Sequence, residues 1–359
     1  MAKKTDSSLA SILSTYGVSK PLEFVDTGVS ALNTVLGGGI ALGYFYTFWG
    51  VQGCGKSTIT CQVVRAFCRQ GLKVVYIDSE RALNSRQKDS FGLSDFEAQG
   101  LFIHLSVQFM DQLEEVGAAL SQDPSIKLVV IDSLSEIQPY ADKELRLQDI
   151  RPGLKAQQSS LLLPRLKHWF ANAGIACIVL LHARANVQMG VVNPYAPKEK
   201  SDGGYATQHV PDVVLKISIG AKLKEKDPVS GDDIVIGATT KLEAEKNKFT
   251  APFHPLTCKL LYGKGISQRY EIIDTALERG VIQKTGNTYI LPSGEKFVGI
   301  GKLYGMPRES LSGLKDYLNG GMSQEDPSVL SASSLEASGL QSTEFDIQES
   351  SVPAIESED

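Results

Sequence analysis

Residues 50–57 read GVQGCGKS, which matches the phosphate-loop pattern G-x-x-x-x-G-K-[ST]. Glycines let consecutive backbone N–H groups curl around a phosphate without Cβ clashes. Lys56 is expected to reach the β- and γ-phosphates of a nucleoside triphosphate, and the Ser57 hydroxyl to hold Mg²⁺. The alternative is a glycine turn with a chance lysine. The residues expected to contact nucleotide are Gly50, Val51, Gln52, Gly53, Cys54, Gly55, Lys56, Ser57 and Thr58.

A metal-organising carboxylate is the next requirement for hydrolysis of a nucleoside triphosphate. Asp132 ends the apolar run 128–131, which is the Walker B pattern. A carboxylate at that position can bind Mg²⁺ beside Ser57, directly or through water. Ser133 follows and can hydrogen-bond into the same shell. We therefore expect Ser57 and Asp132 to form the metal site.

Two carboxylates compete for the role of water activator. Glu80 closes the segment YIDSE, and a carboxylate at the carboxyl end of a strand can accept a proton from attacking water. Asp78 precedes the end of the same predicted strand, so we expect it to support the site. His182 ends another strand in LLHARAN and can contact the γ-phosphate and report its presence. A structural histidine with satisfied hydrogen bonds is an equally good interpretation of His182.

The elements that must position these groups follow from apolar periodicity. Short β-branched apolar runs predict strands, and amphipathic segments between them predict helices. The predicted strands cover 44–49, 72–80, 101–107, 126–137 and 175–183, and the helices 57–70, 111–120 and 157–173; a β pattern continues through 213–220, 234–247 and 258–263. This alternation predicts an α/β fold, a mostly parallel twisted sheet flanked by helices, with the ligand at the carboxyl ends of the strands.

Four segments are expected along the 359 residues. Residues 1–22 contain a short amphipathic helix, 6–17, which must dock on its own body or on a neighbouring subunit. Residues 23–266 form the core, 267–322 a small α+β domain, and 323–359 a disordered acidic tail. The tail has nine acidic residues and no Lys or Arg. It either competes with a polyanion for the body of the protein or simply aids solubility.

Bulk properties exclude several classes of protein. The chain is 42% hydrophobic with a net charge of −5, and it has no apolar run of membrane-spanning length. Its start lacks the apolar core of a signal peptide. Five cysteines without paired spacing suggest reduced thiols, so we expect a cytoplasmic protein without a membrane partner.

Two polar segments, 141–155 and 184–205, follow strands that end at the same edge of the predicted sheet. Long loops of this kind are usually functional, and basic and aromatic groups on them suit single-stranded nucleic acid. Interspersed acidic residues leave the composition alone inconclusive. The candidate DNA-binding residues are Arg146, Arg151, Lys155, Arg184, Lys198, Lys200, Gly203 and Gly204.

Together these segments resemble the RecA family of bacterial and phage DNA recombinases, from about Glu23 to Asn319. The shared signatures beyond the phosphate loop are VDTGVSALNTVLGGGIALG, YIDSERALN, VVIDSLSEI, the GG of SDGGYA, KNKFTAPF and LYGKGIS. The last two are the most specific, because generic phosphate-loop ATPases lack them.

The resemblance implies a RecA-type ATPase core that uses ATP and Mg²⁺ and polymerises into a helical filament on single-stranded DNA. It implies pairing with homologous duplex DNA, strand exchange, and ATP bound between adjacent subunits. Glu80 then looks like the catalytic glutamate, and His182 occupies the place of a γ-phosphate-sensing glutamine. Lys246 and Lys248 look like lysines that reach the neighbour's nucleotide; without the resemblance they would be a solvated basic turn. Asn84 and Tyr262 fall where the family contacts the base or sugar.

Three positions depart from the family pattern. His182 replaces the usual glutamine, and His209 stands where the family has a phenylalanine that passes the nucleotide signal between subunits. Gln87 replaces an aromatic residue near the adenine. These departures keep open an ATP-gated DNA-binding assembly or mediator protein without strand exchange. A ring helicase with this fold is a third, less favoured hypothesis, because it would normally carry a separate partner domain.

Overall fold

The structure is a computed structural model that describes residues 21–140, 153–185, 199–202, 204–226, 231–251 and 255–320. The predicted N-terminal helix and acidic tail lie outside these residues. The chain divides into two compact units, Met1–Asp274 and Thr275–Asp359, and the division falls inside helix α9 (Gln268–Glu278). None of the helices that the structure describes is long and apolar enough to cross a membrane.

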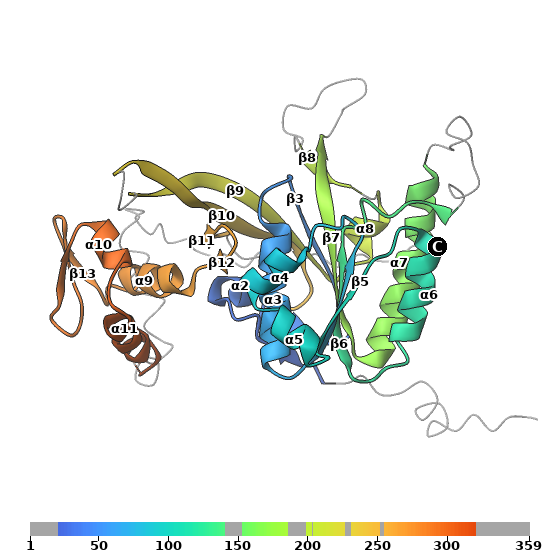
Figure 1. Ribbon diagram of the computed structural model, residues 1–359, viewed down its shortest axis with the longest axis horizontal. Coiled ribbons are helices and arrows are strands. Elements are labelled where there is room, and N and C mark those ends of the chain that lie inside the picture. The colour runs from blue at the N-terminus through green and yellow to red at the C-terminus, as the bar shows by residue number, and fades with distance from the viewer. Residues whose placement is uncertain are drawn as a thin grey trace, which may run out of the picture. The chain divides into compact units, whose positions relative to one another are not determined.

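A ten-stranded sheet forms the centre of the first unit (Figure 1). Its order is β12-β11-β10-β9-β3-β7-β6-β4-β5, with β8 paired to β7. The pairs from β9 to β5 are parallel, and the others are antiparallel. The strands are β3 (Phe45–Gly50), β4 (Lys73–Asp78), β5 (Phe102–Leu105), β6 (Ile126–Asp132), β7 (Ala176–Ala185), β8 (Glu199–Ser201), β9 (Val213–Lys226), β10 (Asp233–Asn247), β11 (Leu256–Leu261) and β12 (Gly265–Ile266).

Helices cover both faces of the parallel part of this sheet (Figure 1). One face packs against α2 (Ser30–Leu36), α3 (Lys56–Arg69), α4 (Ser85–Phe91) and α5 (Ser94–Ala98), and the other against α6 (Met110–Leu120) and α7 (Leu154–Ala173). Burial on both faces explains why the strands are continuous apolar runs. In β4, Val74 and Tyr76 join the first core, and Val75 and Ile77 join the second.

Several short elements of the first unit were not predicted from the sequence. A short antiparallel pair, β1 (Phe24–Val25) and β2 (Ile40–Ala41), precedes β3, and α8 (Ala206–His209) precedes β9. The second unit holds the sheet of β13 (Gln283–Thr285), β14 (Thr288–Ile290) and β15 (Lys296–Val298), with α10 (Ile300–Tyr304) and α11 (Arg308–Gly320). The predicted class, a mostly parallel helix-flanked sheet with a small α+β C-terminal part, is confirmed.

Several predicted boundaries were wrong. β4 ends at Asp78, so Glu80 lies in the segment that follows the strand. β7 continues to Ala185, which places His182 inside it, because β8 pairs with its last residues. α7 begins at Leu154, so Lys155 lies in a helical turn of the segment predicted as a loop.

Register brings the polar strand ends together. In the parallel pairs, Gly50 of β3 lies opposite His182 of β7, and Asp78 of β4 lies opposite Asp132 of β6. Because β10 pairs antiparallel with β9, and β9 runs parallel to β3, β10 runs in the opposite sense to β3. The carboxyl end of β10 therefore lies at the beginning of β3.

Gly237 offers a test of the β10–β11 pairing. A Cβ at this position would lie 2.1 Å from the carbonyl oxygen of Leu260, a backbone atom that cannot rotate away. We expect Gly237→Ala to destabilise the protein by about 1–3 kcal/mol, the usual cost of overpacking. Denaturant unfolding measures this change. Ile234→Ala, at an exposed position of the same strand, is the control and should stay within about 0.5 kcal/mol of the wild type. Equal midpoints for Gly237→Ala and the wild type would contradict the pairing.

Candidate nucleotide-binding site

The phosphate loop joins β3 to α3, and its backbone conformation requires glycine at two positions. A Cβ on Gly50 would lie 2.1 Å from the carbonyl oxygen of Ile217. Gly55, the N-cap of α3, has φ 97°, in the left-handed region that L side chains rarely adopt. The amides of the first turn of this 14-residue helix are free to bind an anion. The loop is therefore shaped as a phosphate cradle.

Lys56 lies over this loop. Its side chain is buried, and Nζ donates to the carbonyl oxygens of Gly50 at 3.0 Å and Val51 at 3.1 Å. An ammonium has three donors, so one remains for a phosphate oxygen. Burial raises the pKa of the Cys54 thiol, against the opposing effect of Lys56, so Cys54 is no nucleophile at neutral pH.

A pocket of about 190 Å³ opens at this loop and gathers side chains from distant parts of the sequence. It brings Glu80, His182 and Tyr262 to the phosphate loop, as expected for parallel strands that end at one edge. Leu260, which sequence reasoning missed, also lines it. The lining residues are Gln52, Gly53, Gly55, Lys56, Ser57, Thr58, Glu80, His182, Leu260 and Tyr262.

Asn84 is not among the residues that line the pocket. Its side chain caps α4 by accepting a hydrogen bond from the backbone N–H of Gln87 at 3.0 Å. The Gln87 side chain in turn accepts from the backbone N–H of Asn84 at 3.3 Å. This reciprocal capping box stabilises the helix start. Contact of Asn84 with a base or sugar stays a prediction.

Glu80 and His182 form a pair at the pocket wall. His182 Nε2 lies 2.9 Å from Glu80 Oε1, and both side chains are about one quarter exposed. An ionised carboxylate only accepts hydrogen bonds, so Nε2 is the protonated ring nitrogen when Glu80 is ionised. This contact can therefore fix the orientation of the Glu80 carboxylate at the pocket.

Asp78, the other candidate base, has a different set of partners. It is buried, and it accepts hydrogen bonds from the backbone N–H of Ala82 at 3.2 Å and Leu83 at 2.9 Å. His104 Nε2 lies 3.3 Å from Oδ2. Burial alone would raise the pKa of Asp78, but hydrogen bonds from His104, Leu83 and Ala82 lower it. Asp78 thus fixes the backbone that follows Glu80.

Asp132 is buried next to the first residues of α3. Tyr76 donates its phenol proton to Asp132 Oδ2 at 2.5 Å, and Ser57 also hydrogen-bonds this carboxylate. Burial raises the pKa of Asp132 to about 6, against these two hydrogen bonds, and the charges of Glu80 and Asp78 add to the rise. A carboxylate held above its usual pKa gains strongly from a nearby cation.

The Asp132–Ser133 peptide bond is cis, and the Ser133 hydroxyl is buried. Within the described part of the chain this hydroxyl has no hydrogen-bond partner. Sequence reasoning missed the role of Tyr76 beside Asp132. The available signal was a single tyrosine in an otherwise aliphatic buried run, because a buried phenol needs a partner.

The residues of this site fit Mg²⁺. Ser57 and Asp132 are hydrogen-bonded to each other, so a hydroxyl and a carboxylate oxygen already lie together. Across the described ranges no three His, Cys, Asp or Glu side chains group to hold a metal by themselves. Mg²⁺ usually takes one or two protein oxygens and completes its shell with water and substrate phosphates. This donor set is of that kind.

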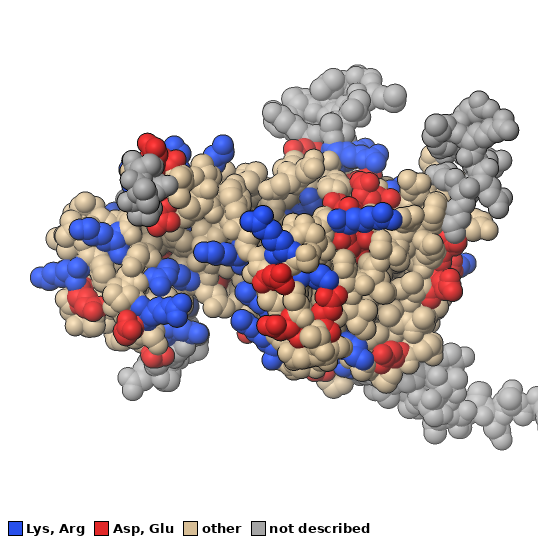
Figure 2. All heavy atoms as spheres, viewed as in Figure 1, with Lys and Arg blue, Asp and Glu red and all other residues tan. Residues whose placement is uncertain are grey.

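The candidate DNA-binding residues are described only in part: Arg146, Arg151, Lys198 and Gly203 lie outside the described residues. Arg184 is exposed and pairs with Asp202 at 2.9 Å, and Lys200 lies opposite it in the β7–β8 pairing. Gly204 has φ 76°. Lys155 is half-buried and donates to the Ser135 carbonyl, and burial lowers its pKa. On the face drawn in Figure 2, basic and acidic side chains are interspersed.

Lys246 and Lys248 do not join the pocket. The end of β10 pairs with the start of β9, which lies beside Tyr46 near the beginning of β3. The phosphate loop begins at Gly50, four residues further along β3. At about 3.3 Å per residue the two places are roughly 13 Å apart along the strand. Neither lysine is therefore placed to act on the phosphate loop of its own chain.

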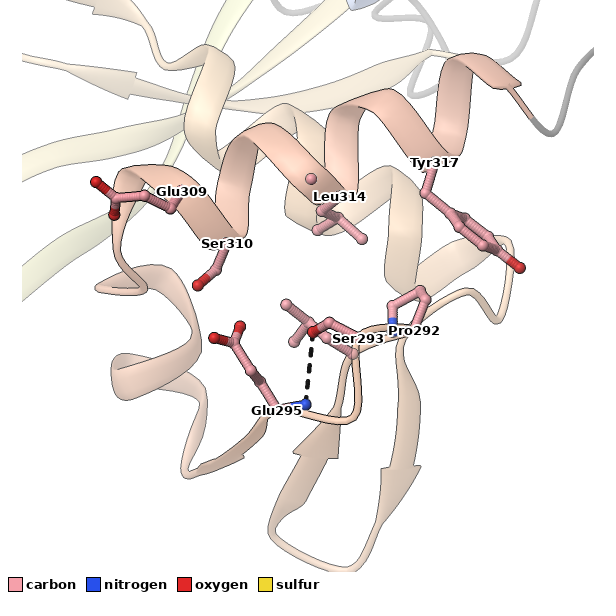
Figure 3. Close-up of a pocket in the computed structure, with 9 residues that line it drawn as sticks. Pro292, Ser293, Glu295, Glu309, Ser310, Leu314 and Tyr317 are labelled. Carbon is pink, nitrogen blue, oxygen red and sulfur yellow. Dashed lines mark hydrogen bonds between the residues drawn. The ribbon is translucent and has the colours of Figure 1, made fainter.

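A larger pocket, of about 510 Å³, lies in the second unit between α11 and the β14–β15 turn (Figure 3). Its carboxylates, Glu295 and Glu309, would repel phosphate groups, and it lacks a glycine-rich loop. The smaller pocket at Gly50 is the better nucleotide site for this reason. The larger one is lined by Leu291, Pro292, Ser293, Glu295, Glu309, Ser310, Gly313, Leu314 and Tyr317.

The chain is similar to one family model and to one solved structure. The family model of the RecA N-terminal domain matches residues 8–267. A crystal structure of the RadB recombinase aligns with 22% sequence identity and a TM-score of 0.48, and the alignment covers 68% of this chain and 98% of that chain. Because the domain match spans well over half of the sequence, the chain belongs to the RecA family.

Proposed function

We propose that this protein is an ATP-dependent homologous DNA recombinase. It forms helical filaments on single-stranded DNA, hydrolyses ATP with Mg²⁺ as cofactor, and catalyses pairing and strand exchange with homologous duplex DNA. The observation that carries this proposal is the division of the ATPase residues between two places. The phosphate loop, Glu80 and His182 share one pocket, and Lys246 and Lys248 lie at the opposite end of β3.

Hydrolysis begins with the placement of ATP. The amides of the loop and the first turn of α3 bind the phosphates, and Lys56 contributes its remaining donor. Ser57 and Asp132 hold Mg²⁺, which neutralises phosphate charge when bound. Tyr76 fixes the position of the Asp132 carboxylate through its 2.5 Å hydrogen bond to Oδ2.

Glu80 then acts as the general base. It accepts a proton from the water that attacks the γ-phosphorus, and the 2.9 Å contact with His182 holds its carboxylate at the pocket wall. Contact of a γ-phosphate with His182 competes with this bond. His182 therefore links the presence of a γ-phosphate to the position of the base.

The backbone of His182 also leads to both DNA-binding segments. Its N–H donates to the Ser135 hydroxyl at 3.3 Å, and the Ser135 carbonyl accepts from Lys155. Its carbonyl accepts from the backbone N–H of Asp202 at 2.9 Å, and Asp202 pairs with Arg184. Movement of His182 is thereby transmitted to the described ends of segments 141–155 and 184–205.

Lys246 and Lys248 complete the site of the neighbouring subunit. Two ammonium groups close to the transferred phosphoryl group stabilise its developing charge, which makes hydrolysis depend on assembly. The wide separation of these lysines from the phosphate loop of their own chain supports an action on another copy.

A mediator protein that assembles on DNA without exchanging strands is the second candidate. His209 favours it, because its ring stacks on Tyr205 of the same chain, with centroids 3.6 Å apart and planes at 26°. The residue that stands in place of the expected inter-subunit phenylalanine thus has an aromatic partner within its own chain. Both candidates share ATP-gated assembly and differ in the reaction on duplex DNA.

Strand exchange separates the two candidates. A recombinase should hydrolyse ATP faster with single-stranded DNA and should form joint molecules with homologous duplex in the presence of ATP and Mg²⁺. An agarose-gel assay with a heterologous duplex as the control measures this reaction. DNA-dependent filaments without joint molecules would support the mediator. The absence of DNA-stimulated hydrolysis would contradict both the recombinase and the mediator.

Glu80→Gln tests the general base. The amide keeps the size of the side chain but cannot accept the proton of water, so turnover should fall by about 100-fold or more. ATP affinity, measured by fluorescence titration, should change little because the phosphate cradle is intact. Glu115→Gln, at an exposed position of α6, is the control and should behave like the wild type. Hydrolysis that survives in Glu80→Gln would assign water activation to another residue.

Subunit mixing tests the action of Lys248 on a neighbour. Lys248→Ala should lower DNA-stimulated hydrolysis, and Glu80→Gln should nearly abolish it. In random mixed filaments, about a quarter of the sites combine an intact Glu80 with an intact Lys248 from the next subunit in a head-to-tail contact. The mixture should therefore hydrolyse ATP faster than the average of the two separate rates. A rate equal to the average of the two separate rates would place Lys248 outside the neighbour's site.

A further inference from the structure

Asp212 is a buried carboxylate that has no part in the chemistry described above. It is 2% exposed and lies between α8 and β9. Oδ1 accepts from Lys167 Nζ at 2.7 Å and from Lys248 Nζ at 2.8 Å. Oδ2 accepts from the backbone N–H of Phe45 at 3.1 Å. Both carboxylate oxygens are thus occupied, and one of the partners is a lysine of the KNK segment.

Two elements, β3 and α7, hold Asp212 in place. Phe45 begins β3, Lys167 belongs to α7, and the backbone N–H of Asp212 donates to the Phe45 carbonyl at 2.7 Å. Lys167 also donates to the carbonyl of Val210 at 2.7 Å. The carboxylate is therefore fixed relative to the central sheet, whereas the side chain of Lys248 is 55% exposed. The exposed lysine is anchored to a rigid and buried point.

Charge balance lets Asp212 hold Lys248 without neutralising it. Burial alone would raise the pKa of Asp212, but hydrogen bonds from Lys167 and Lys248 lower it, so the group is ionised at neutral pH. One negative charge is shared between two ammonium groups, which leaves the cluster positive. Lys246 adds a further positive charge, and its own pKa is lowered by burial and by Lys248 and Lys167.

The segment before Asp212 holds the other lysine. Lys246 Nζ donates to the carbonyl oxygen of His209 at 2.8 Å. The short stretch from His209 to Asp212 therefore orients both ammonium groups at the amino end of β3. A lysine side chain is flexible, and an anchored head group loses less freedom when it meets a phosphate. Lys248 has three donors, so it can keep Asp212 and still donate to a phosphate oxygen.

We propose that Asp212 is the positioning residue for Lys248 and directs its ammonium group to the ATP of the neighbouring subunit. This inference rests on the proposed function, in which Lys248 serves a neighbour. It predicts that loss of the Asp212 charge damages the next subunit's site and leaves the site on its own chain intact.

Asp212→Asn removes the charge and retains the shape of the side chain. We expect DNA-stimulated turnover to fall by about 10-fold or more, the effect of a misplaced group. ATP affinity of the isolated subunit should stay unchanged, because the pocket at Gly50 is distant. The decisive measurement is a one-to-one mixture with Glu80→Gln. There, an Asp212→Asn subunit with an intact Glu80 can receive a correctly held Lys248 from its neighbour, and turnover should rise above both separate rates.

Asp212→Glu is the second variant, for the case in which Asp212→Asn fails to fold. It keeps the negative charge between both lysines but shifts the anchor by one methylene group. It should also lower stimulated turnover and be rescued by Glu80→Gln subunits. Lys241→Met is the matched control, because it removes an exposed lysine of β10 that pairs with Glu243 and leaves Asp212 and all its partners intact. It should keep at least half of the DNA-stimulated turnover that the wild type shows in the same assay.

The outcomes distinguish this inference from the proposed function. If Lys248→Ala is rescued by Glu80→Gln and both folded Asp212 variants are not, Asp212 acts within its own subunit and the inference is overturned. If neither Lys248→Ala nor the Asp212 variants are rescued, the result contradicts the proposed action of Lys248 on a neighbour. The inference about Asp212 then loses its basis as well. Wild-type turnover of Asp212→Asn would also overturn the inference, because the anchor would then be dispensable.

Discussion

The parallel pairing of β3, β7, β6 and β4 is the constraint on which the rest of the structure depends. Parallel strands end at the same edge of a sheet, so each crossover returns a new polar group to one place. This pairing sets Gly50 opposite His182 and Asp78 opposite Asp132. A slip in register would break these pairings and displace the polar groups that meet at the pocket.

Three buried aspartates show how environment divides one side-chain type among different roles. Asp78 accepts from backbone amides and fixes a loop, and its pKa is lowered. Asp132 has a phenol and a hydroxyl as partners, and burial raises its pKa to about 6, so it favours a cation. Asp212 is ionised between two ammonium groups and serves as an anchor. Their partners, more than their burial, decide these roles.

Local patterns carried most of the predictions that the structure confirms. The phosphate-loop glycines, the apolar strands and the alternation with helices are properties of short windows, and the central sheet follows from them. Contacts between distant segments were not predictable in the same way. The bond of Tyr76 to Asp132 and that of Asp212 to Lys248 join residues far apart in sequence, and only the strand order brings them together. The end of β7 was misplaced because β8 extends it, a pairing with no local signal.

The reversal of β10 places Lys246 and Lys248 at the end of the sheet opposite to the phosphate loop. Its antiparallel run returns the chain from the phosphate-loop side of the sheet to the beginning of β3, where Asp212 meets Lys248. A fully parallel sheet would send each strand's carboxyl end, and with it the two lysines, to the edge that already holds Gly50. The site would then be complete in one chain. In the proposed function, a head-to-tail contact of two copies joins the two ends, and such contacts propagate into helical filaments when they do not close. If the proposed function holds, the direction of this one strand makes ATP hydrolysis depend on assembly.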